Sequence, residues 1–308
     1  MTTVTRVWGE TFRSLRIRNF KLFFIGQFVS QTGTWMTMVA QTLLVLDLTG
    51  SGVMLGLLAA CQFGPILLLG AWTGTVADRV DKRRLLMLTQ TGAMLQSLAL
   101  GLVVLTGHAT VTNVLLLAAV QGVLTAFDNP VRRAFVVEMV PTSHVPNAVS
   151  LNSTIMTGAR VIGPVLAGIL IALFGYAWAF LIDAFSYLAV LASLAAMKLG
   201  ELYPSERTRR AGGQVRDGLR YVRHNRDLFV PIVMMAIIGT LAFNFSVSTP
   251  LLVTDTLGGS AQSYTFLFSV MSIGAVLVAL ATARRREVPA GHMVASAIIF
   301  GIGMFALA

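Results

Sequence analysis

Residues 74–86 form a charged segment between two long apolar runs, and they read Gly74-Thr75-Val76-Ala77-Asp78-Arg79-Val80-Asp81-Lys82-Arg83-Arg84-Leu85-Leu86. The apolar run before this segment extends from Gly52 to Ala77, and the one after it from Leu85 to Thr106. A helix needs about 20 apolar residues to cross a bilayer core of about 30 Å, and both runs are that long. The short polar connection predicts two membrane-spanning helices that lie antiparallel to each other.

The rest of the chain repeats this pattern of long apolar runs and short polar turns. Seven further candidate spans cover residues 20–46, 112–127, 148–174, 177–197, 228–253, 262–283 and 292–308. Hydrophobic residues make up 56% of the chain and charged residues only 12%, whereas soluble domains carry about 25% charged residues. The sequence therefore predicts an all-α integral membrane protein with nine spans in this chain.

The basic residues are confined to alternate loops. Every Lys and Arg except Arg160 falls in the N-terminal arm or in the loops after the second, fourth, sixth and eighth runs, and the opposite loops hold none. This asymmetry is the pattern of the positive-inside rule. We expect a multi-pass protein of the inner or plasma membrane with a cytoplasmic N-terminus. The net charge of +10 is then explained by cytoplasmic loops, and nucleic acid is not expected as a partner.

An internal repeat divides the chain. Arg18 to Asp47 and Arg226 to Asp255 frame the first and seventh runs with the same spacing, and a basic cluster follows the next run in each copy. We expect a six-helix bundle over residues 1–199, a cytoplasmic linker with a basic amphipathic helix over 200–227, and a partial second bundle of three helices over 228–308. Two six-helix halves are a recurring transporter plan, so the second half is expected to lack three helices.

The segment that starts at Gly74 resembles the signature loop of the major facilitator superfamily, G-x-L-A-D-R-x-G-R-K-x-x-L, in both content and position. The resemblance implies a major facilitator helical bundle. It also implies a latch at the cytoplasmic gate formed by Gly74, Asp78, Arg79, Lys82 and Arg83, to which we add Asp128. Asp78 would dock on the second half, Gly74 would allow close helix packing, and the basic residues would anchor at lipid headgroups. The sequence departs from the pattern at Asp81, where glycine is usual.

Further stretches are similar to an exporter group that contains enterobactin exporters and transmembrane secretion effector proteins. They are residues 33–36, Gln41, 48–51, 126–130, 146–148, 151–153 and 160–164 with Gly168. The similarity implies a secondary transporter that exports a small molecule, such as a drug, siderophore or metabolite, by proton antiport and alternating access. The partners expected are that substrate, protons and membrane lipids, and we expect a monomer.

Candidate coupling residues are few. Many drug/proton antiporters of the superfamily carry R-x-x-Q-G in the fourth span, but here Ala118 stands at the arginine position before Gln121-Gly122. Arg160 in the fifth span is the candidate replacement, since an intramembrane charge is costly and usually functional. Asp183 could pair with Arg160. The alternatives are a structural Arg160 bonded to carbonyl groups and an Asp183 near the outer headgroups.

Polar residues within the runs follow helical spacing, which predicts stripes that converge on a central cavity. The predicted stripes are Gln27, Gln31, Thr34 and Gln41 in the first run, Gln121, Thr125 and Asp128 in the fourth, and Asn152, Met156 and Arg160 in the fifth, with Asn244 and Ser248 from the seventh. The alternative is hydrogen bonding between helices without substrate contact.

A hinge is expected in the fifth run at Gly158, Gly163, Pro164 and Gly168, because proline removes a helical hydrogen bond and glycine permits close approach. Packing without gating is the alternative interpretation for this segment.

Enzymatic chemistry is not expected. The sequence has no Walker loop, no paired His and Glu metal motif and no G-x-S-x-G elbow, which removes the known machinery for ATP-driven pumping and hydrolysis. The single cysteine, Cys61, allows no internal disulfide and no thiolate cluster, and no cofactor is expected. The competing hypotheses are a non-transporting receptor or scaffold with the same fold and an inactive fragment.

Overall fold

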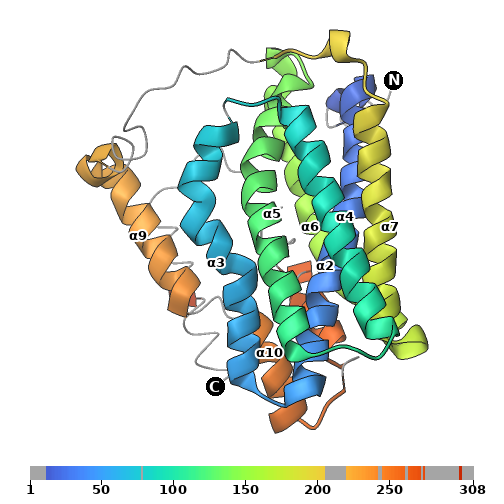
Figure 1. Ribbon diagram of the computed structural model, residues 1–308. Coiled ribbons are helices and arrows are strands. Elements are labelled where there is room, and N and C mark those ends of the chain that lie inside the picture. The colour runs from blue at the N-terminus through green and yellow to red at the C-terminus, as the bar shows by residue number, and fades with distance from the viewer. Residues whose placement is uncertain are drawn as a thin grey trace, which may run out of the picture.

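The computed structural model describes residues 12–77, 79–204, 220–241, 245–260, 263–271, 273–274 and 298–299. Every regular element among these residues is helical (Figure 1). The order is η1 (Arg13–Arg16), α2 (Arg18–Thr49), α3 (Gly52–Ala77), α4 (Lys82–Leu105), α5 (Val111–Glu138), η2 (Thr142–His144), α6 (Val145–Phe174), α7 (Tyr176–Ala195), η3 (Leu199–Glu201), α9 (Arg226–Leu241), α10 (Phe245–Leu251) and the π-helical turn η4 (Leu252–Thr256). The all-α prediction is confirmed.

Helices α2 to α7 form one bundle and confirm the expected six helices of the N-terminal half. α2 packs along α6 and α7, α4 packs against α5 and α7, and α3 packs on α5. Two apolar clusters hold the bundle, one around Phe20, Phe135 and Leu194 and the other around Leu43 and Phe180. The cavity described below lies among these helices.

Short turns join the helices as the polar connections predict. Gly50, with a φ of 58°, ends α2 and donates its N–H to Leu46 O at 2.7 Å. Asp81, which replaces the usual glycine of the signature loop, has a φ of −66° and caps α4 by accepting a hydrogen bond from Arg84 N at 2.9 Å. No positive φ is needed at Asp81, because the residue acts as a helix cap.

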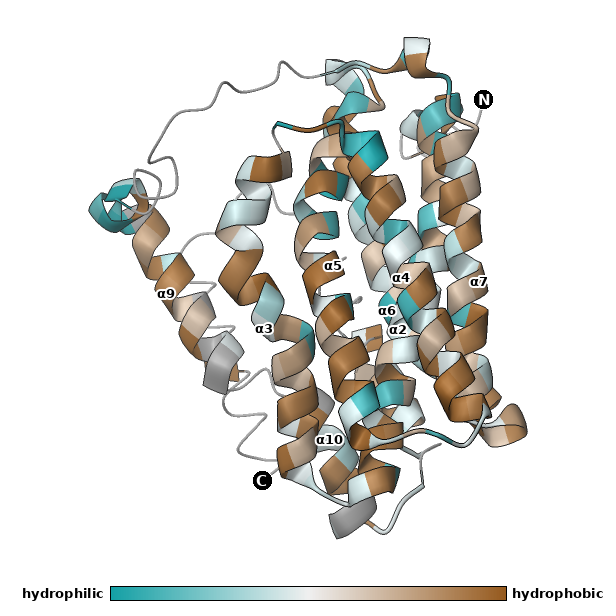
Figure 2. Ribbon diagram, in the orientation of Figure 1, coloured by the Kyte–Doolittle hydropathy of each residue, from teal (hydrophilic) through white to brown (hydrophobic). Residues whose placement is uncertain are grey.

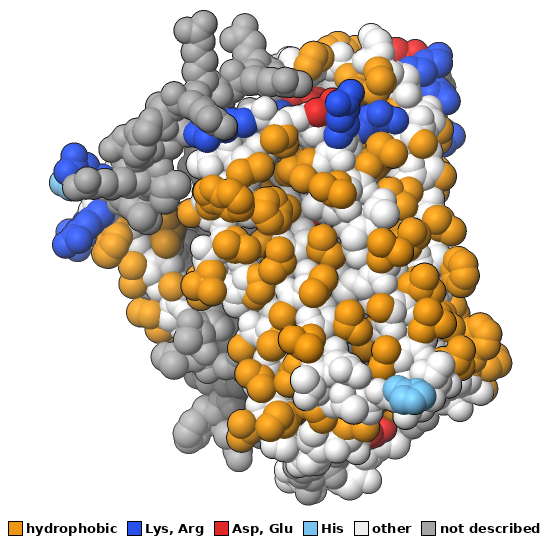
Figure 3. Space-filling model, in the orientation of Figure 1, with side chains coloured by type: hydrophobic (Ala, Val, Ile, Leu, Met, Phe, Trp, Pro, Cys, Tyr) orange, Lys and Arg blue, Asp and Glu red, His pale blue; other side chains and the backbone are white. Residues whose placement is uncertain are grey.

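The outer surface of the bundle is apolar. Leu67 and Leu68 on α3 are 84% and 81% exposed, and hydrophobic side chains cover the middle of the visible face while Lys and Arg gather at the end near the N-terminus (Figure 3). An apolar belt of this kind suits the lipid core of a membrane. Five described helices are long and apolar enough to span it: α3, α4, α5, α6 together with η2, and α7.

α2 is not among those five, although it has 32 residues and lies inside the bundle. Its polar side chains lower its hydropathy, and they point inward: Gln27, Gln31 and Gln41 are 1%, 7% and 2% exposed. Figure 2 shows hydrophilic positions within the bundle as well as at its end. A helix that contributes polar groups to an interior is therefore less hydrophobic than its neighbours.

The fourth predicted span ends too early. The expectation placed its end at Phe127 and put Arg132 and Arg133 in a loop, but α5 continues to Glu138 with Pro130 inside it. Arg132 is buried within this helix and forms an ion pair with Asp128. The charge of Arg132 indicated a loop in the sequence, but the helix continues through this residue because Asp128 balances its charge inside the bundle.

The second half is described only in part. α9, α10 and η4 cover the seventh predicted span, and α10 packs against α3 and α2. Gly168 on α6 lies directly against Thr265 in the helical segment 263–271. Residues 205–219 of the predicted linker, and the ninth span apart from residues 298–299, lie outside the described residues.

Candidate functional site

A cavity of about 220 Å³ lies in the middle of the helix bundle. α2, α3, α4, α5 and α7 line it, with one residue, Met156, from α6. The predicted stripe residues on its wall are Gln31, Thr34, Gln41, Gln121, Thr125 and Asp128, and Asp183 lies on the wall as well. The structure thus brings most of the predicted substrate and coupling candidates to one site.

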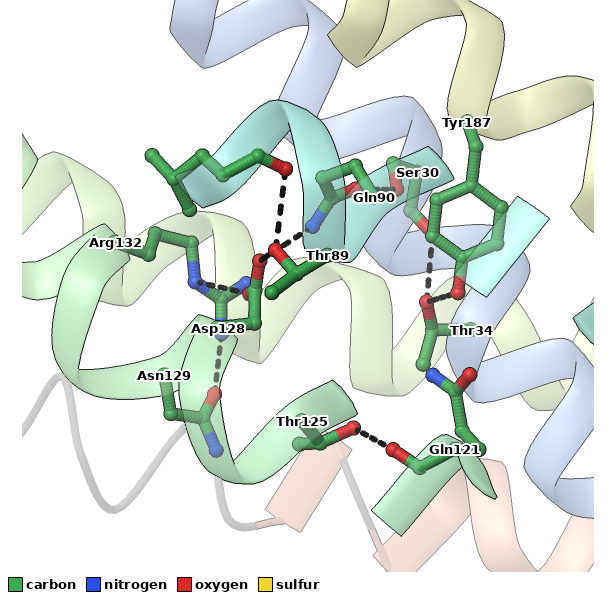
Figure 4. A network of polar contacts seen from close by, with 11 residues as sticks. Ser30, Thr34, Thr89, Gln90, Gln121, Thr125, Asp128, Asn129, Arg132 and Tyr187 are labelled. Atoms are coloured by element: carbon green, nitrogen blue, oxygen red, sulfur yellow. Dashed lines mark hydrogen bonds and ion pairs between the residues drawn. The ribbon is translucent and has the colours of Figure 1, made fainter. Parts of the chain in front are cut away.

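Asp128 is the centre of a hydrogen-bonded network on one wall of the cavity (Figure 4). Its Oδ1 accepts hydrogen bonds from Gln90 Nε2 at 2.7 Å and Thr89 Oγ1 at 3.0 Å. Its Oδ2 lies 3.5 Å from Arg132 Nε. The Asp128 carboxylate is therefore buried with a matching cation and two polar donors. It belongs to the cavity rather than to the signature loop with which it was grouped.

The same network continues across the bundle. Arg132 Nη2 donates to Asn129 Oδ1 at 2.6 Å, and Ser30 Oγ donates to Gln90 Oε1 at 3.3 Å. Thr34 Oγ1 lies 3.1 Å from the hydroxyl of Tyr187. These contacts link α2, α4, α5 and α7 through polar side chains.

Another part of the cavity wall carries the side-chain amides of Gln41, Gln62 and Gln121. Gln62 Nε2 on α3 donates to Gln41 Oε1 at 2.8 Å, which leaves Gln41 Nε2 without a hydrogen-bond partner among the described residues. Gln121 Oε1 is also buried without a partner there. Buried amide groups of this kind are expected to bind water or a ligand.

Asp183 on α7 also lines the cavity, but its surroundings differ from those of Asp128. It is only 1% exposed, and its Oδ2 accepts a hydrogen bond from Ser97 Oγ at 2.9 Å. The Oδ1 atom lies 3.3 Å from Ser186 Oγ. Within the described chain no salt bridge reaches this carboxylate. The structure does not support the alternative of a position near the outer headgroups, because Asp183 faces into the bundle between α2 and α4.

Arg160 does not pair with Asp183. Its guanidinium carbon lies 5.2 Å from the centre of the Trp35 ring, a cation–π arrangement. Trp35 lines the cavity, so Arg160 lies at the cavity margin. The predicted ion pair is wrong because Asp183 is turned to α4 and Arg160 to the indole of α2.

Three stripe candidates lie elsewhere. Gln27 is 1% exposed and does not line the cavity, and neither of its amide atoms has a partner among the described residues. Asn152 is half-buried on α6 and also does not line the cavity. Asn244 lies outside the described residues.

The signature loop lies at the end of the bundle that carries the basic residues. Lys82 is buried and its Nζ lies 2.7 Å from Glu138 Oε1, so it joins α4 to the end of α5. Arg83 Nε donates to Leu194 O of α7 at 2.7 Å. We expected both side chains to bind lipid headgroups. The structure contradicts this expectation, because each side chain points into the protein.

The remaining loop residues complete this picture. Arg79 is half-buried in the turn between α3 and α4, and Asp78 lies outside the described residues. No described atom lies near the position of a Cβ on Gly74, so among the described residues this glycine does not provide the expected close packing. The close approach to α3 occurs instead at Gly122 of α5, where a Cβ would lie 2.6 Å from Cys61 O.

The glycines predicted as a hinge are packing positions in this structure. α6 is one continuous helix with Pro164 inside it. A Cβ on Gly163 would lie 2.6 Å from Trp35 Cβ, and one on Gly158 would lie 3.2 Å from Phe28 Cε2. These two glycines bring α6 close to α2, while Gly168 adjoins the helical segment 263–271.

Several residues of the site were missed from the sequence. They are Gln62, Gln90, Ser97, Glu138, Arg132 and Tyr187, which the structure places in the cavity wall, beside Asp183 or at the Lys82 ion pair. Gln90 and Ser97 are seven residues apart in a largely apolar run, and this spacing was a usable signal because it puts both on one helix face. The pairing of Lys82 with Glu138 had no local signal, since 56 residues separate them.

Comparison with known proteins supports a transporter fold. A family model described as transmembrane secretion effector matches residues 9–308. The fold is also similar to the crystal structure of a bacterial homologue of the human lysosomal transporter Spinster, solved in an inward-facing and unoccupied conformation. It superimposes with a TM-score of 0.65 at 13% sequence identity, over 86% of this chain and 62% of that chain.

Curated relatives are transporters by name. The staphyloferrin A transporter of Staphylococcus aureus (strain NCTC 8325 / PS 47) is 27% identical over 84% of this chain and 66% of its own length. The uncharacterized MFS-type transporter YfiS of Bacillus subtilis (strain 168) is 24% identical over 84% of this chain and 62% of its own length. The chain thus spans slightly less than two thirds of the length of these relatives.

Proposed function

Because the chain belongs to the transmembrane secretion effector family of major facilitator transporters, we propose that the protein is a secondary transporter that exports a small molecule. Transport proceeds by alternating access around the central cavity, and the inward movement of protons drives it. Relatives of this chain are membrane transporters, and one of them carries a siderophore. A siderophore, drug or secondary metabolite is the substrate class that we propose.

The cavity is the observation that carries this proposal. It lies at the middle of the helices, holds about 220 Å³ and combines amide and hydroxyl groups with aromatic and apolar side chains. Sites of this kind bury an organic ligand against apolar walls and orient it through a few polar groups. Gln41 and Gln121 have buried amide atoms without a hydrogen-bond partner among the described residues, and both residues line the cavity, where these atoms can bond a ligand or water.

The contacts between the two parts of the chain support alternating access. Gly52 at the start of α3 adjoins Leu251 of α10, and Gly168 adjoins Thr265. α10 and the start of α3 lie at the end of the bundle that is opposite the N-terminus (Figure 1). Close packing at one end is the arrangement expected of a transporter that opens at the other end.

The charge distribution supports an orientation. Lys and Arg gather at the end of the bundle that holds the signature loop (Figure 3), and such clusters face the cytoplasm in plasma-membrane proteins. We therefore propose that this end is cytoplasmic. Export would start from this side of the membrane.

The test is energised efflux from cells that make the intact protein. Cells are loaded with a panel of fluorescent dyes and radiolabelled siderophores, and efflux is followed before and after a protonophore is added. We expect export of at least one compound that stops with the protonophore and does not occur with the Gln121→Leu variant. Absence of efflux for the whole panel, with the protein folded in the membrane, would count against the proposed exporter.

A further inference from the structure

We propose that Asp183, Ser97, Ser186 and Thr37 form a binding site for a monovalent cation, either a proton or Na⁺. Use of this cation to drive transport rests on the proposed function, in which the proton is the coupling ion and Na⁺ would take its place. Binding of the cation does not rest on that function. The site lies within the six-helix bundle, between α2, α4 and α7, and is separate from the Asp128 network.

Oxygen atoms from three helices surround the Asp183 side chain. Ser97 Oγ of α4 lies 2.9 Å from Asp183 Oδ2, and Ser186 Oγ of α7 lies 3.3 Å from Oδ1. The hydroxyl of Thr37 on α2 faces the same carboxylate and is buried without a hydrogen bond of ordinary geometry. Carboxylate, hydroxyl and carbonyl oxygens are the ligands that hard cations prefer.

The hydroxyl hydrogens of Ser97 and Ser186 are not available to the carboxylate alone. Ser97 Oγ is 3.0 Å from Phe180 O and 2.9 Å from Asp183 Oδ2, while Ser186 Oγ is 2.7 Å from Asp183 O and 3.3 Å from Oδ1. Each hydroxyl has one hydrogen to donate. The Ser97 and Ser186 hydrogens are therefore shared between backbone carbonyls and the carboxylate, and Thr37 Oγ1 makes no hydrogen bond of ordinary geometry, so the hydroxyl groups compensate the carboxylate charge only in part. A bound cation supplies the missing positive charge.

Among the described residues, no Lys or Arg side chain supplies a positive charge to Asp183. α2 contributes Gly33 and Thr37 to the site, α4 contributes Ser97, and α7 contributes Ser186 and Tyr187. Among the described residues, the other charged groups on the cavity wall are Asp128 and Arg132, which are paired with each other. An uncompensated carboxylate is costly inside a membrane protein.

The charge balance favours a monovalent ion. One carboxylate neutralises one positive charge, and a divalent cation would leave an excess charge in a buried site. The cation can reach the site from the cavity, because Asp183 and Thr37 both line its wall. The same two residues would let an occupied site influence a substrate in the cavity.

A purely structural role is the alternative. Asp183 could simply join α4 to α7 through Ser97. An amide at position 183 keeps an oxygen that accepts the Ser97 hydrogen bond but removes the negative charge. Asp183→Asn therefore separates the two roles, because a structural link survives this substitution and a cation site does not.

The binding test uses the intact protein, purified in detergent, and measures its apparent Tm. One series raises Na⁺ against choline at constant ionic strength and alkaline pH, and the other lowers the pH in choline alone. A ligand that binds only the folded state raises Tm as its concentration rises. We expect one of the two series to raise the Tm of the wild type, and we expect Asp183→Asn to lose that response.

Two serine variants provide a matched comparison. Ser186 and Ser193 are both buried on α7, and each donates to a carbonyl of its own helix at 2.7 Å. Only Ser186 also contacts the Asp183 carboxylate. We expect Ser186→Ala to change the apparent cation affinity about 3- to 10-fold, the range of one neutral hydrogen bond. The affinity for Na⁺ falls because a ligand oxygen is lost, whereas the affinity for a proton rises because a hydrogen bond to the charged carboxylate is lost. Ser193→Ala should leave either affinity unchanged.

The two Tm series distinguish the possible ligands. A response to Na⁺ identifies sodium as the ligand, and a response to pH alone identifies the proton. A wild type that responds to neither, or a response that Asp183→Asn retains, overturns the site.

Transport in proteoliposomes then tests coupling, with the substrate found in the efflux screen. We expect the identified ion gradient to drive accumulation by the wild type, and Asp183→Asn to lose accumulation while it retains exchange of substrate. If Asp183→Asn still accumulates substrate, the coupling role of the site is wrong but the proposed transporter stands. If the wild type itself moves no substrate, the proposed function fails, and the Tm series still decides whether the cation binds.

Discussion

Asp128 and Asp183 line the same cavity, but among the described residues only Asp128 has a cation beside it. Asp128 has Arg132 at 3.5 Å and a short hydrogen bond from Gln90 at 2.7 Å, whereas Asp183 has only hydroxyl neighbours and no cation among the described residues. A buried ion pair is balanced internally, so removal of one partner leaves an uncompensated charge. The comparison separates a carboxylate that holds the fold from one whose charge is available for binding.

The largest effect is expected on the compensated side, from Arg132→Leu. This substitution leaves Asp128 charged and buried without its cation, which costs about 3 to 5 kcal/mol in comparable cases. The free energy of unfolding, measured by titration with sodium dodecyl sulfate, should fall accordingly. Arg133→Leu is the matched control because Arg133 is the next residue and is exposed. Equal losses for both variants would contradict the assigned role of the ion pair.

A smaller loss is expected for Gln90→Leu, which removes the shortest hydrogen bond to Asp128. Hydrogen bonds to charged groups contribute about 1.5 to 3 kcal/mol, and we expect a loss of that size in the same unfolding assay. Gln96 on the same helix is buried as well, but neither of its amide atoms has a partner among the described residues. Gln96→Leu should therefore be neutral or stabilising, and a loss equal to that of Gln90→Leu would refute the distinction.

Gly33→Ala tests the other side of the comparison. A Cβ at this position would lie 2.5 Å from Ser186 Oγ and directly against the Asp183 carboxylate. Overpacking of this kind costs about 1 to 3 kcal/mol. Gly26→Ala is matched to it, since its Cβ would meet α7 at 2.8 Å from Ala189 O.

Both glycine variants should lower the free energy of unfolding by similar amounts. Only Gly33→Ala should alter the response of Tm to Na⁺ or pH, because Gly26 packs two turns away from the carboxylate. A changed ion response in Gly26→Ala would show that general loosening of the contact between α2 and α7, rather than the site itself, controls binding.

Much of the architecture could be predicted from the sequence, because each apolar run must form a helix in the membrane. The polar stripes of α2 and α5 were also visible, since helical spacing places Gln31 and Thr34, or Gln121 and Thr125, on one face. What failed was the assignment of charges. Arg132 looked like a loop residue and Asp183 like a partner of Arg160, because only the packing of α4, α5 and α7 determines which opposite charge or hydroxyl lies within reach.

The same limit applies to the signature loop. Its pattern indicated a charged latch, and the positions of Lys82 and Arg83 at the end of the bundle agree with its place in the fold. Their side chains nevertheless turn to Glu138 and to the carbonyl of Leu194. A motif records which residues occur together, but their partners come from helices that are distant in sequence.

The smallest effect on stability is expected for Asp183→Asn. The amide retains an acceptor for Ser97 and removes a buried charge that has no cation, so the hydrogen bond lost or weakened at Ser186 is the main cost, about 1 kcal/mol or less. Asp128→Asn, by contrast, strands the buried guanidinium of Arg132 and should cost several times as much. The free energies of unfolding of the two variants, measured under one condition, compare the two carboxylates directly. If Asp183→Asn were as destabilising as Asp128→Asn, Asp183 would be a structural residue, and the division between a compensated and an available carboxylate would not hold.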